Sequence, residues 1–129
     1  LTMLWLLSIL AAQLNWHTEK TYQELTWQAY DAQAIAEAAA NGERVFVDFT
    51  ADWCLTCQFN EKIILNTNRF KRFVSEKKVK LFRADLTESN EVYTAALNSY
   101  GRDGIPVYIY YVNGKYEILP LFFSVGNLK

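Results

Sequence analysis

The sequence predicts an α/β fold in which a central mixed β-sheet is flanked by helices. Segments of strand composition alternate along the chain with helical segments, which is typical of βαβ units with parallel strands. The last two strand segments are instead joined by Asn113-Gly114, the dipeptide that most strongly indicates an antiparallel hairpin. A length of 129 residues, of which 51% are apolar, fits one domain with its own core.

The first half of the chain is expected to form two strands separated by one helix. Residues 25–30 (LTWQAY) have strand composition. Asp31 is a suitable N-cap for the alanine-rich helix that follows, and Asn41-Gly42 marks its end. Residues 45–49 form an apolar run interrupted only by Asp48, which predicts a central strand covered on both faces.

The second half is expected to begin with a helix over residues 54–65 that turns Phe59, Ile63 and Ile64 towards the core. The elements expected after it are a second helical stretch at 68–78, a strand at 79–86, a helix capped by Ser89 or Asn90 that stops at Gly101, and the two hairpin strands within 104–119.

Residues 1–20 are expected to precede the domain, which then covers residues 21–129. Leu1–Leu14 is almost entirely apolar but shorter than the roughly 20 residues that span a membrane, and it lacks the basic start of a signal peptide. It is either the end of a membrane helix or an apolar helix packed on the domain or on a partner. The net charge of −1 and the lack of a basic cluster give no indication of nucleic-acid binding.

The two cysteines of the chain, Cys54 and Cys57, are separated by two residues. A disulfide across so short a loop stabilises a fold weakly. A zinc site needs about four ligands, whereas the chain adds only His17, and a haem attachment site needs a histidine where Gln58 stands. We therefore favour a redox-active dithiol–disulfide pair, which needs no metal or organic cofactor because the thiols carry the two electrons.

The expected position of each cysteine suggests its role. Cys54 stands where a strand ends and a helix begins, and the free N–H groups of a helix N-terminus should lower the pKa of its thiol. Cys57 lies one turn further into the helix, less exposed, where it can resolve a mixed disulfide formed by Cys54.

The segment VDFTADWCLTC resembles the active-site segment of the thioredoxin superfamily, and more narrowly that of the C-terminal periplasmic domain of DsbD-type thiol:disulfide interchange proteins. The resemblance is carried by VFVDFTADWC, the cysteine pair, FNEK and GIPVYIYY, and it extends from about Trp27 to Leu119. It implies a thioredoxin-like fold and protein-disulfide reductase activity. The chain departs from ordinary thioredoxins in having Leu55-Thr56 between its cysteines, and it ends at Lys129 before the helix with which that fold normally finishes.

Two carboxylates are candidate catalytic residues beside the cysteines. Asp48, buried in its strand, should have a raised pKa and could exchange a proton with Cys57 directly or through a water. Glu61 lies four residues after Cys57 on the same helix face and could raise the pKa of that thiol. Asp48 could instead support local structure and Glu61 could be a solvated helix residue. The resembling family has an acid at both places, which favours the catalytic interpretation.

Three further residues are candidates for substrate binding. Trp53 could form an apolar wall beside the thiol or simply pack the end of the strand. Pro106 suits the start of a strand because it has no N–H. The resemblance implies that the Ile105-Pro106 bond is cis, that Pro106 faces the cysteines, and that the backbone of Ile105 pairs with a substrate segment.

The resemblance also implies partners and a location. The domain would receive electrons from a membrane-embedded domain and pass them to a thioredoxin-like or immunoglobulin-like periplasmic acceptor, and from there to disulfide isomerases or cytochrome c maturation factors. It would be periplasmic and tethered to the bacterial inner membrane. Two alternatives are a disulfide-forming oxidase with the same fold and a non-catalytic binding module that docks through Trp53 and the Ile105-Pro106 loop.

Overall fold

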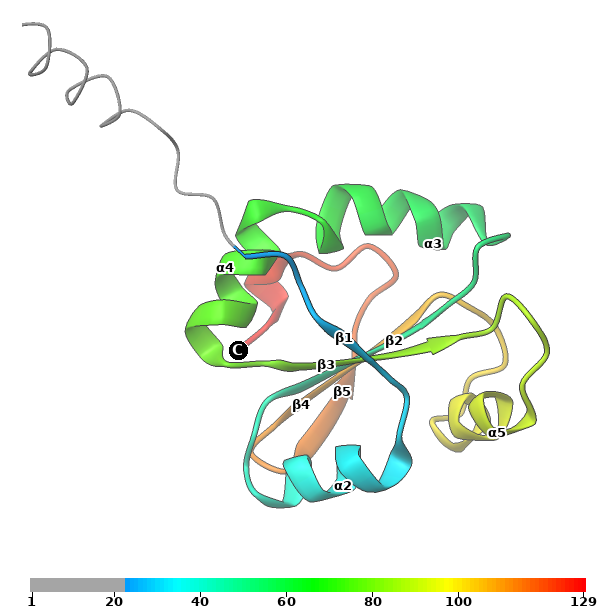
Figure 1. The fold of residues 1–129 in the computed structure, drawn as a ribbon, viewed down its shortest axis with the longest axis horizontal. Helices are drawn as coiled ribbons and strands as arrows, with labels where there is room; N and C mark the ends of the chain where they lie inside the picture. Colours follow the sequence, from blue (N-terminus) through cyan, green and yellow to red (C-terminus); the bar gives the residue numbers. More distant parts are fainter. Residues whose placement is uncertain (1–22) are drawn as a thin grey trace, which may run out of the picture.

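The computed structural model describes residues 23–129, which form a five-stranded mixed sheet with helices on both faces (Figure 1). The apolar segment and linker expected at residues 1–20, and the expected start of the domain at Thr21, lie outside the described residues. The strands are β1 (Trp27–Ala29), β2 (Val45–Thr50), β3 (Lys80–Asp85), β4 (Val107–Val112) and β5 (Lys115–Ile118).

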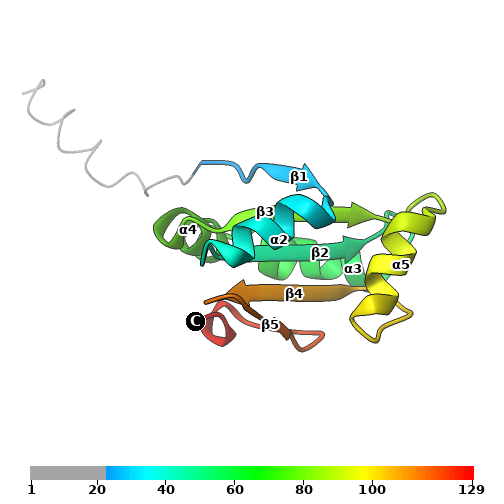
Figure 2. The ribbon, with the colours of Figure 1, turned by 90° about the horizontal axis from the view of Figure 1, so that it is seen from below.

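The sheet has the strand order β1-β3-β2-β4-β5, and Figure 2 shows the five strands side by side in this order, with the sheet seen face-on. The pairs β1–β3 and β2–β3 are parallel, whereas β2–β4 and β4–β5 are antiparallel. Asn113 and Gly114 both have positive φ, as the two-residue turn between β4 and β5 requires. The predicted mixed sheet and its terminal hairpin are therefore confirmed.

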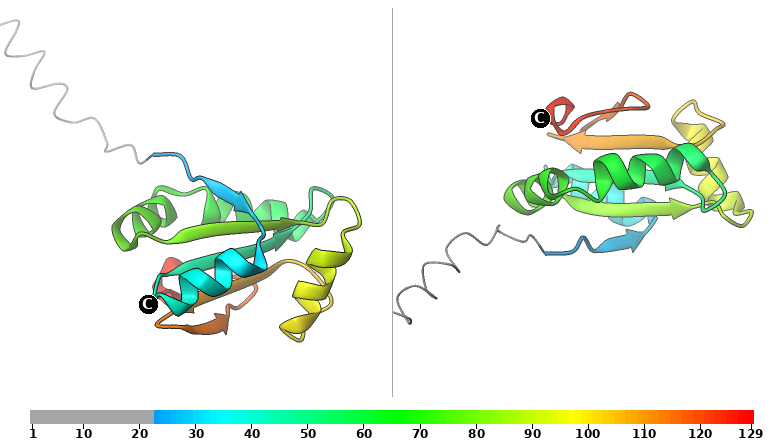
Figure 3. Two further views of the ribbon diagram at one scale, coloured as in Figure 1. Left: turned by 60° about the horizontal axis from the view of Figure 1, so that its bottom comes forward. Right: turned by 90° about the horizontal axis from the view of Figure 1, so that it is seen from above.

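Helices α2 and α5 cover one face of the sheet, and α3, η2 and α4 cover the other (Figures 1 and 3). Asp31 and Asn90 cap α2 and α5, each accepting a hydrogen bond from the backbone N–H three residues later. The elements are α2 (Ala32–Ala40), α3 (Leu55–Asn60), the π-helical turn η2 (Glu61–Leu65), α4 (Asn68–Lys77), α5 (Glu91–Ser99) and the short 3₁₀ turn η3 (Val125–Asn127).

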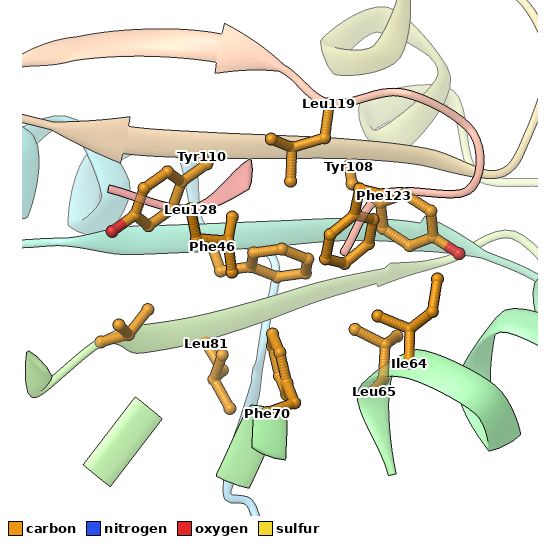
Figure 4. Close-up of a cluster of buried hydrophobic side chains, with 11 residues drawn as sticks. Phe46, Ile64, Leu65, Phe70, Leu81, Tyr108, Tyr110, Leu119, Phe123 and Leu128 are labelled. Atoms are coloured by element: carbon orange, nitrogen blue, oxygen red, sulfur yellow. The ribbon is translucent and has the colours of Figure 1, made fainter. Parts of the chain in front are cut away.

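Strand β2 lies at the centre of the sheet and divides its side chains between the two faces. Val47 and Phe49 belong to the core beneath α2 and α5, whereas Phe46 belongs to the core beneath η2 and α4 (Figure 4). Because side chains alternate along a strand, Asp48 lies on the same face as Phe46. The carboxylate therefore faces the layer that begins with the cysteines.

The helix after the cysteines is turned differently from the prediction. Ile64 is buried as expected, but Phe59 and Ile63 are 53% and 48% exposed, and Asn60 is fully buried. With Cys57 facing inward, the residues three and seven positions later share its face. The prediction for Phe59 and Ile63 was wrong because it placed apolar residues inside, whereas a polar side chain with hydrogen-bond partners occupies the inner position.

The segment that follows β5 completes the core on the α4 side. Phe123 and Leu128 are buried against Phe46 and its neighbours, whereas Phe122 is exposed and packs edge-on against Phe59. None of the helices in residues 23–129 combines the length and the hydropathy that a membrane-spanning helix needs.

Candidate active site

Cys54 and Cys57 form a disulfide at the start of α3, with their Cα atoms 5.2 Å apart. Cys54 is the N-cap of the helix, and its Sγ accepts a hydrogen bond from the N–H of Cys57 at 3.2 Å. The same N–H can donate to a Cys54 thiolate once the disulfide is reduced. Both side chains are buried, Cys57 more deeply, so the predicted placement of the two thiols is confirmed.

The loop between β2 and α3 is tied to the loop after β3 through Thr87. The N–H of Asp52 donates to Thr87 Oγ1 at 2.8 Å, and the indole N–H of Trp53 donates to the Thr87 carbonyl at 3.2 Å. These bonds fix the indole while leaving it 64% exposed, and the neighbouring Leu55 is 87% exposed. Apolar side chains that face solvent therefore lie beside the disulfide, and the indole among them is held by Thr87.

The Ile105–Pro106 peptide bond is cis, as the resemblance implied. The carbonyl oxygen of Ile105 lies 4.0 Å from Cys54 Sγ. Trp53 and Ile105 both line a groove of about 400 Å³, together with Leu86 and Ser89. Two residues that line the groove, Leu86 and Ile105, also pack against the cysteines. That the groove binds a substrate segment stays a prediction.

Asp48 is 1% exposed, and burial raises its pKa to about 7 despite the opposing charge of Arg83. Arg83 Nε donates to Asp48 Oδ2 at 3.2 Å. A carboxyl group with this pKa exchanges its proton near neutral pH, as a general acid–base in thiol exchange must. The expectation of a buried aspartate with raised pKa is thus met, while its catalytic role stays a prediction.

Arg83 was not predicted, and it connects both candidate carboxylates. Its Nη2 donates to the two oxygens of Glu61 at 3.1 and 3.0 Å, and its guanidinium lies 4.1 Å from the centre of the Trp27 ring. Glu61, in η2, is therefore coupled to Asp48 through Arg83. That Glu61 acts on the Cys57 thiol stays a prediction.

A second buried polar pair, also not predicted, lies beneath α3. Asn60 Nδ2 donates to the hydroxyl of Tyr108 at 3.1 Å and to the carbonyl of Leu121 at 2.7 Å. Asn60 follows Cys57 by three residues on the inner face of the helix, and Tyr108 lies directly opposite Asp48 in the β2–β4 pairing. Both residues therefore border the region between the cysteines and the buried carboxylate.

The described residues bring no three His, Cys, Asp or Glu side chains together in a way that could hold a metal ion. The chemical groups that the site does offer are the disulfide, a carboxyl group that titrates near neutral pH and an open apolar groove. This set suits exchange between two dithiol–disulfide pairs.

Comparison with known proteins places these features in a family. A family model described as thioredoxin-like matches residues 26–112. The thiol:disulfide interchange protein DsbD 1 of Pseudomonas aeruginosa is 32% identical over 97 residues, which are 75% of this chain and 16% of that protein. DsbD of Campylobacter jejuni is 27% identical over 97 residues, 74% of this chain and 17% of its own length. The chain thus matches about a sixth of the length of these relatives.

Solved structures agree with this assignment. The oxidised C-terminal domain of DsbD from Neisseria meningitidis superposes with a TM-score of 0.56 at 26% identity, covering 73% of this chain and 86% of that one. A thioredoxin from Thermus thermophilus, at 21% identity and a TM-score of 0.61, covers 81% of this chain and 82% of its own and shows the shared fold.

Proposed function

The chain belongs to the thioredoxin-like family, and from this premise we propose that it is a protein-disulfide reductase domain that passes electrons outward from a membrane-embedded donor. The observation that carries the proposal is the Cys54–Cys57 pair at the start of α3, with Cys54 Sγ at the N-cap and within reach of the Cys57 N–H. The similarity to the C-terminal domain of DsbD supports the reducing direction over the oxidising one.

The reaction begins with both cysteines reduced. The Cys54 thiolate attacks one sulfur of a substrate disulfide, so that a Cys54–substrate bond forms and the first substrate thiolate leaves. The Cys57 thiol then gives its proton to Asp48, directly or through a water, and attacks Cys54 Sγ. The second substrate thiolate leaves, and the two electrons of the dithiol now reside on the substrate.

The surfaces around the disulfide support docking of a protein substrate. Trp53 and Leu55 expose apolar surface beside the cysteines, and rigid aromatic groups of this kind anchor protein interfaces. The groove between Trp53 and Ile105 can hold an extended segment that presents its disulfide to Cys54.

A periplasmic location at the inner membrane is part of the proposal. It is supported by the similarity to DsbD proteins and by the apolar composition of Leu1–Leu14. The donor is then a dithiol in a membrane domain, and the acceptors are thioredoxin-like or immunoglobulin-like periplasmic domains that serve disulfide isomerases or cytochrome c maturation.

Insulin reduction by the full chain, with dithiothreitol as electron source, tests the activity. The wild-type chain should accelerate precipitation of the insulin B chain, whereas Cys54→Ser should not exceed dithiothreitol alone. Equal rates for the two proteins would contradict the proposal and favour a non-catalytic binding module.

A further inference from the structure

Within residues 23–129, Asp48 and Asn60 are the two buried residues with a carboxylate or amide side chain, and each has one oxygen atom without a hydrogen-bond partner. These atoms are Asp48 Oδ1 and Asn60 Oδ1. Buried polar atoms in folded proteins are nearly always hydrogen-bonded, so an unpartnered one needs an explanation. The other oxygen of the carboxylate, Asp48 Oδ2, is already bound by Arg83.

The orientation of the Asn60 amide is fixed by its neighbours. The carbonyl of Leu121 can only accept a hydrogen bond, so the NH₂ group of Asn60 must face it. The same NH₂ group donates to the oxygen of Tyr108, which leaves the hydroxyl hydrogen of Tyr108 available for another acceptor. Burial and the nearby Asp48 raise the pKa of Tyr108, so this hydrogen stays in place at neutral pH.

Tyr108 and Asp48 are directly opposite each other on antiparallel strands. Side chains in this relationship share one face of the sheet, with Cβ atoms about 5 Å apart. In the buried cluster that packs against η2 and α4, the hydroxyl groups of Tyr108 and Tyr110 point towards opposite ends of the cluster (Figure 4). The free donor of Tyr108 and the free acceptor of Asp48 thus lie on the same side of the sheet, on adjacent strands.

We propose that Tyr108, held by Asn60, is a positioning residue for Asp48, and that its hydroxyl donates to Oδ1 of the ionised carboxylate through one bridging water, since no protein group among the described residues bonds Oδ1 itself. The inference rests on the proposed function, in which Asp48 receives the proton of Cys57. Oδ2 then receives its hydrogen bond from Arg83, and Oδ1 receives one that originates from Tyr108. With both oxygens hydrogen-bonded, the carboxylate can be ionised although it is buried. When the proton arrives on Oδ1, the bridging water turns and accepts a hydrogen bond from the protonated carboxyl group instead.

The groups around Asp48 that bear charge or titrate come from four elements: Arg83 and Asp85 of β3, Glu61 of η2, Tyr108 of β4 and, in the reduced protein, Cys57 of α3. The two acidic neighbours disfavour a charged Asp48 and Arg83 favours it. Tyr108 is the neutral donor in this set, and its effect can be measured without changing any charge.

The test is a titration of the Asp48 carboxyl carbon by NMR in the reduced full chain. Tyr108→Phe, which removes only the hydroxyl, should raise the pKa of Asp48 by roughly one pH unit, the effect expected for one hydrogen bond to a charged group. The matched control is Tyr110→Phe, a buried tyrosine of the same strand whose hydroxyl bonds Arg44 instead, and it should leave the pKa of Asp48 unchanged.

The variant Asn60→Leu tests whether Asn60 acts on Asp48 only through Tyr108. Because Asn60 acts through Tyr108, the single variant should raise the pKa of Asp48 by less than Tyr108→Phe does, and adding it to Tyr108→Phe should change nothing further. The proposal is overturned if Tyr108→Phe shifts the pKa of Asp48 no more than the Tyr110→Phe control does. It is also overturned if the pKa shifts caused by Tyr108→Phe and Asn60→Leu add in the double variant. The titration needs no turnover, so it stands apart from the insulin assay, whose failure would overturn the proposed function alone.

Discussion

Arg83 lies directly opposite Asp48 on the neighbouring parallel strand, and its Nε donates to Asp48 Oδ2 at 3.2 Å. The arginine is half-buried whereas the carboxylate is almost completely enclosed. Its guanidinium also donates to Glu61 and stacks over the Trp27 ring. Three residues therefore fix its position. The charge that offsets the cost of ionising Asp48 is therefore fixed in place beside the redox pair.

Replacing Arg83 by methionine should move the pH profile of disulfide exchange to higher pH by about one unit or more, because an opposite charge at this distance lowers the pKa of a carboxyl group. The rate of mixed-disulfide resolution, followed by stopped flow from pH 5 to 10, measures the shift. Lys80→Met is the matched control, since Lys80 pairs with Glu43 at the surface of the same strand. Coinciding profiles for both variants would show that Arg83 does not act on Asp48.

The stability of the protein should fall as pH rises from about 4 to about 7. Burial raises the pKa of Asp48 to about 7 in the folded chain from its ordinary value of 3.8, so the unfolded state binds fewer protons in this window. The loss is on the order of 4 kcal/mol, since each pKa unit corresponds to about 1.4 kcal/mol.

Asp48→Asn should remove this dependence and be the more stable protein above pH 7, the difference shrinking towards pH 4. Urea unfolding across the range measures it, and Asp103→Asn, at an exposed loop position, is the control. Parallel stability curves for wild type and Asp48→Asn would mean that Asp48 titrates normally in the folded state.

The two cysteine variants should behave differently with a disulfide-bearing protein. Cys57→Ser retains the attacking thiol and cannot resolve the product, so a mixed disulfide through Cys54 should accumulate. Cys54→Ser should form little adduct because Cys57 is the more buried sulfur. Non-reducing electrophoresis and mass spectrometry identify the linked cysteine. Adducts that form mainly through Cys57 would reverse the assigned roles.

Trp53→Ala should weaken substrate docking more than chemistry. The indole is exposed and lines the groove beside Cys54, so its removal should raise KM for a protein substrate roughly tenfold or more, as for an interface hot spot, with little change in kcat. Reduction of a small disulfide such as oxidised glutathione serves as the control, because it does not need the apolar side chains beside the disulfide. A comparable loss with both substrates would indicate that Trp53 supports the loop instead.

The fold could be predicted from the sequence because its signals are local. Asp31 and Asn90 mark helix starts, and Asn113-Gly114 sets the hairpin turn. The cysteine pair and Asp48 were equally visible, since a charged residue within an apolar strand stands out from its neighbours.

The partners of the buried carboxylate could not be read in the same way. Arg83 belongs to a partly exposed strand and is set beside Asp48 only by the β2–β3 register, which is a tertiary property. A buried carboxylate nevertheless requires a cation, and a basic residue on a neighbouring strand was the signal to look for. Asn60 was missed because the prediction placed apolar residues on the inner face of the helix. For the same reason the prediction placed Phe59 in the core, although the structure exposes it.

The reduction potential of the Cys54–Cys57 pair distinguishes a disulfide reductase from a disulfide-forming protein. It is measured by equilibrating the full chain with glutathione redox buffers, trapping free thiols and quantifying the two forms. A protein-disulfide reductase should give a value between roughly −200 and −270 mV, in the range of reducing members of the fold. A value near −120 mV would mark a strong oxidant, and the chain would then be a disulfide-forming protein rather than an electron donor.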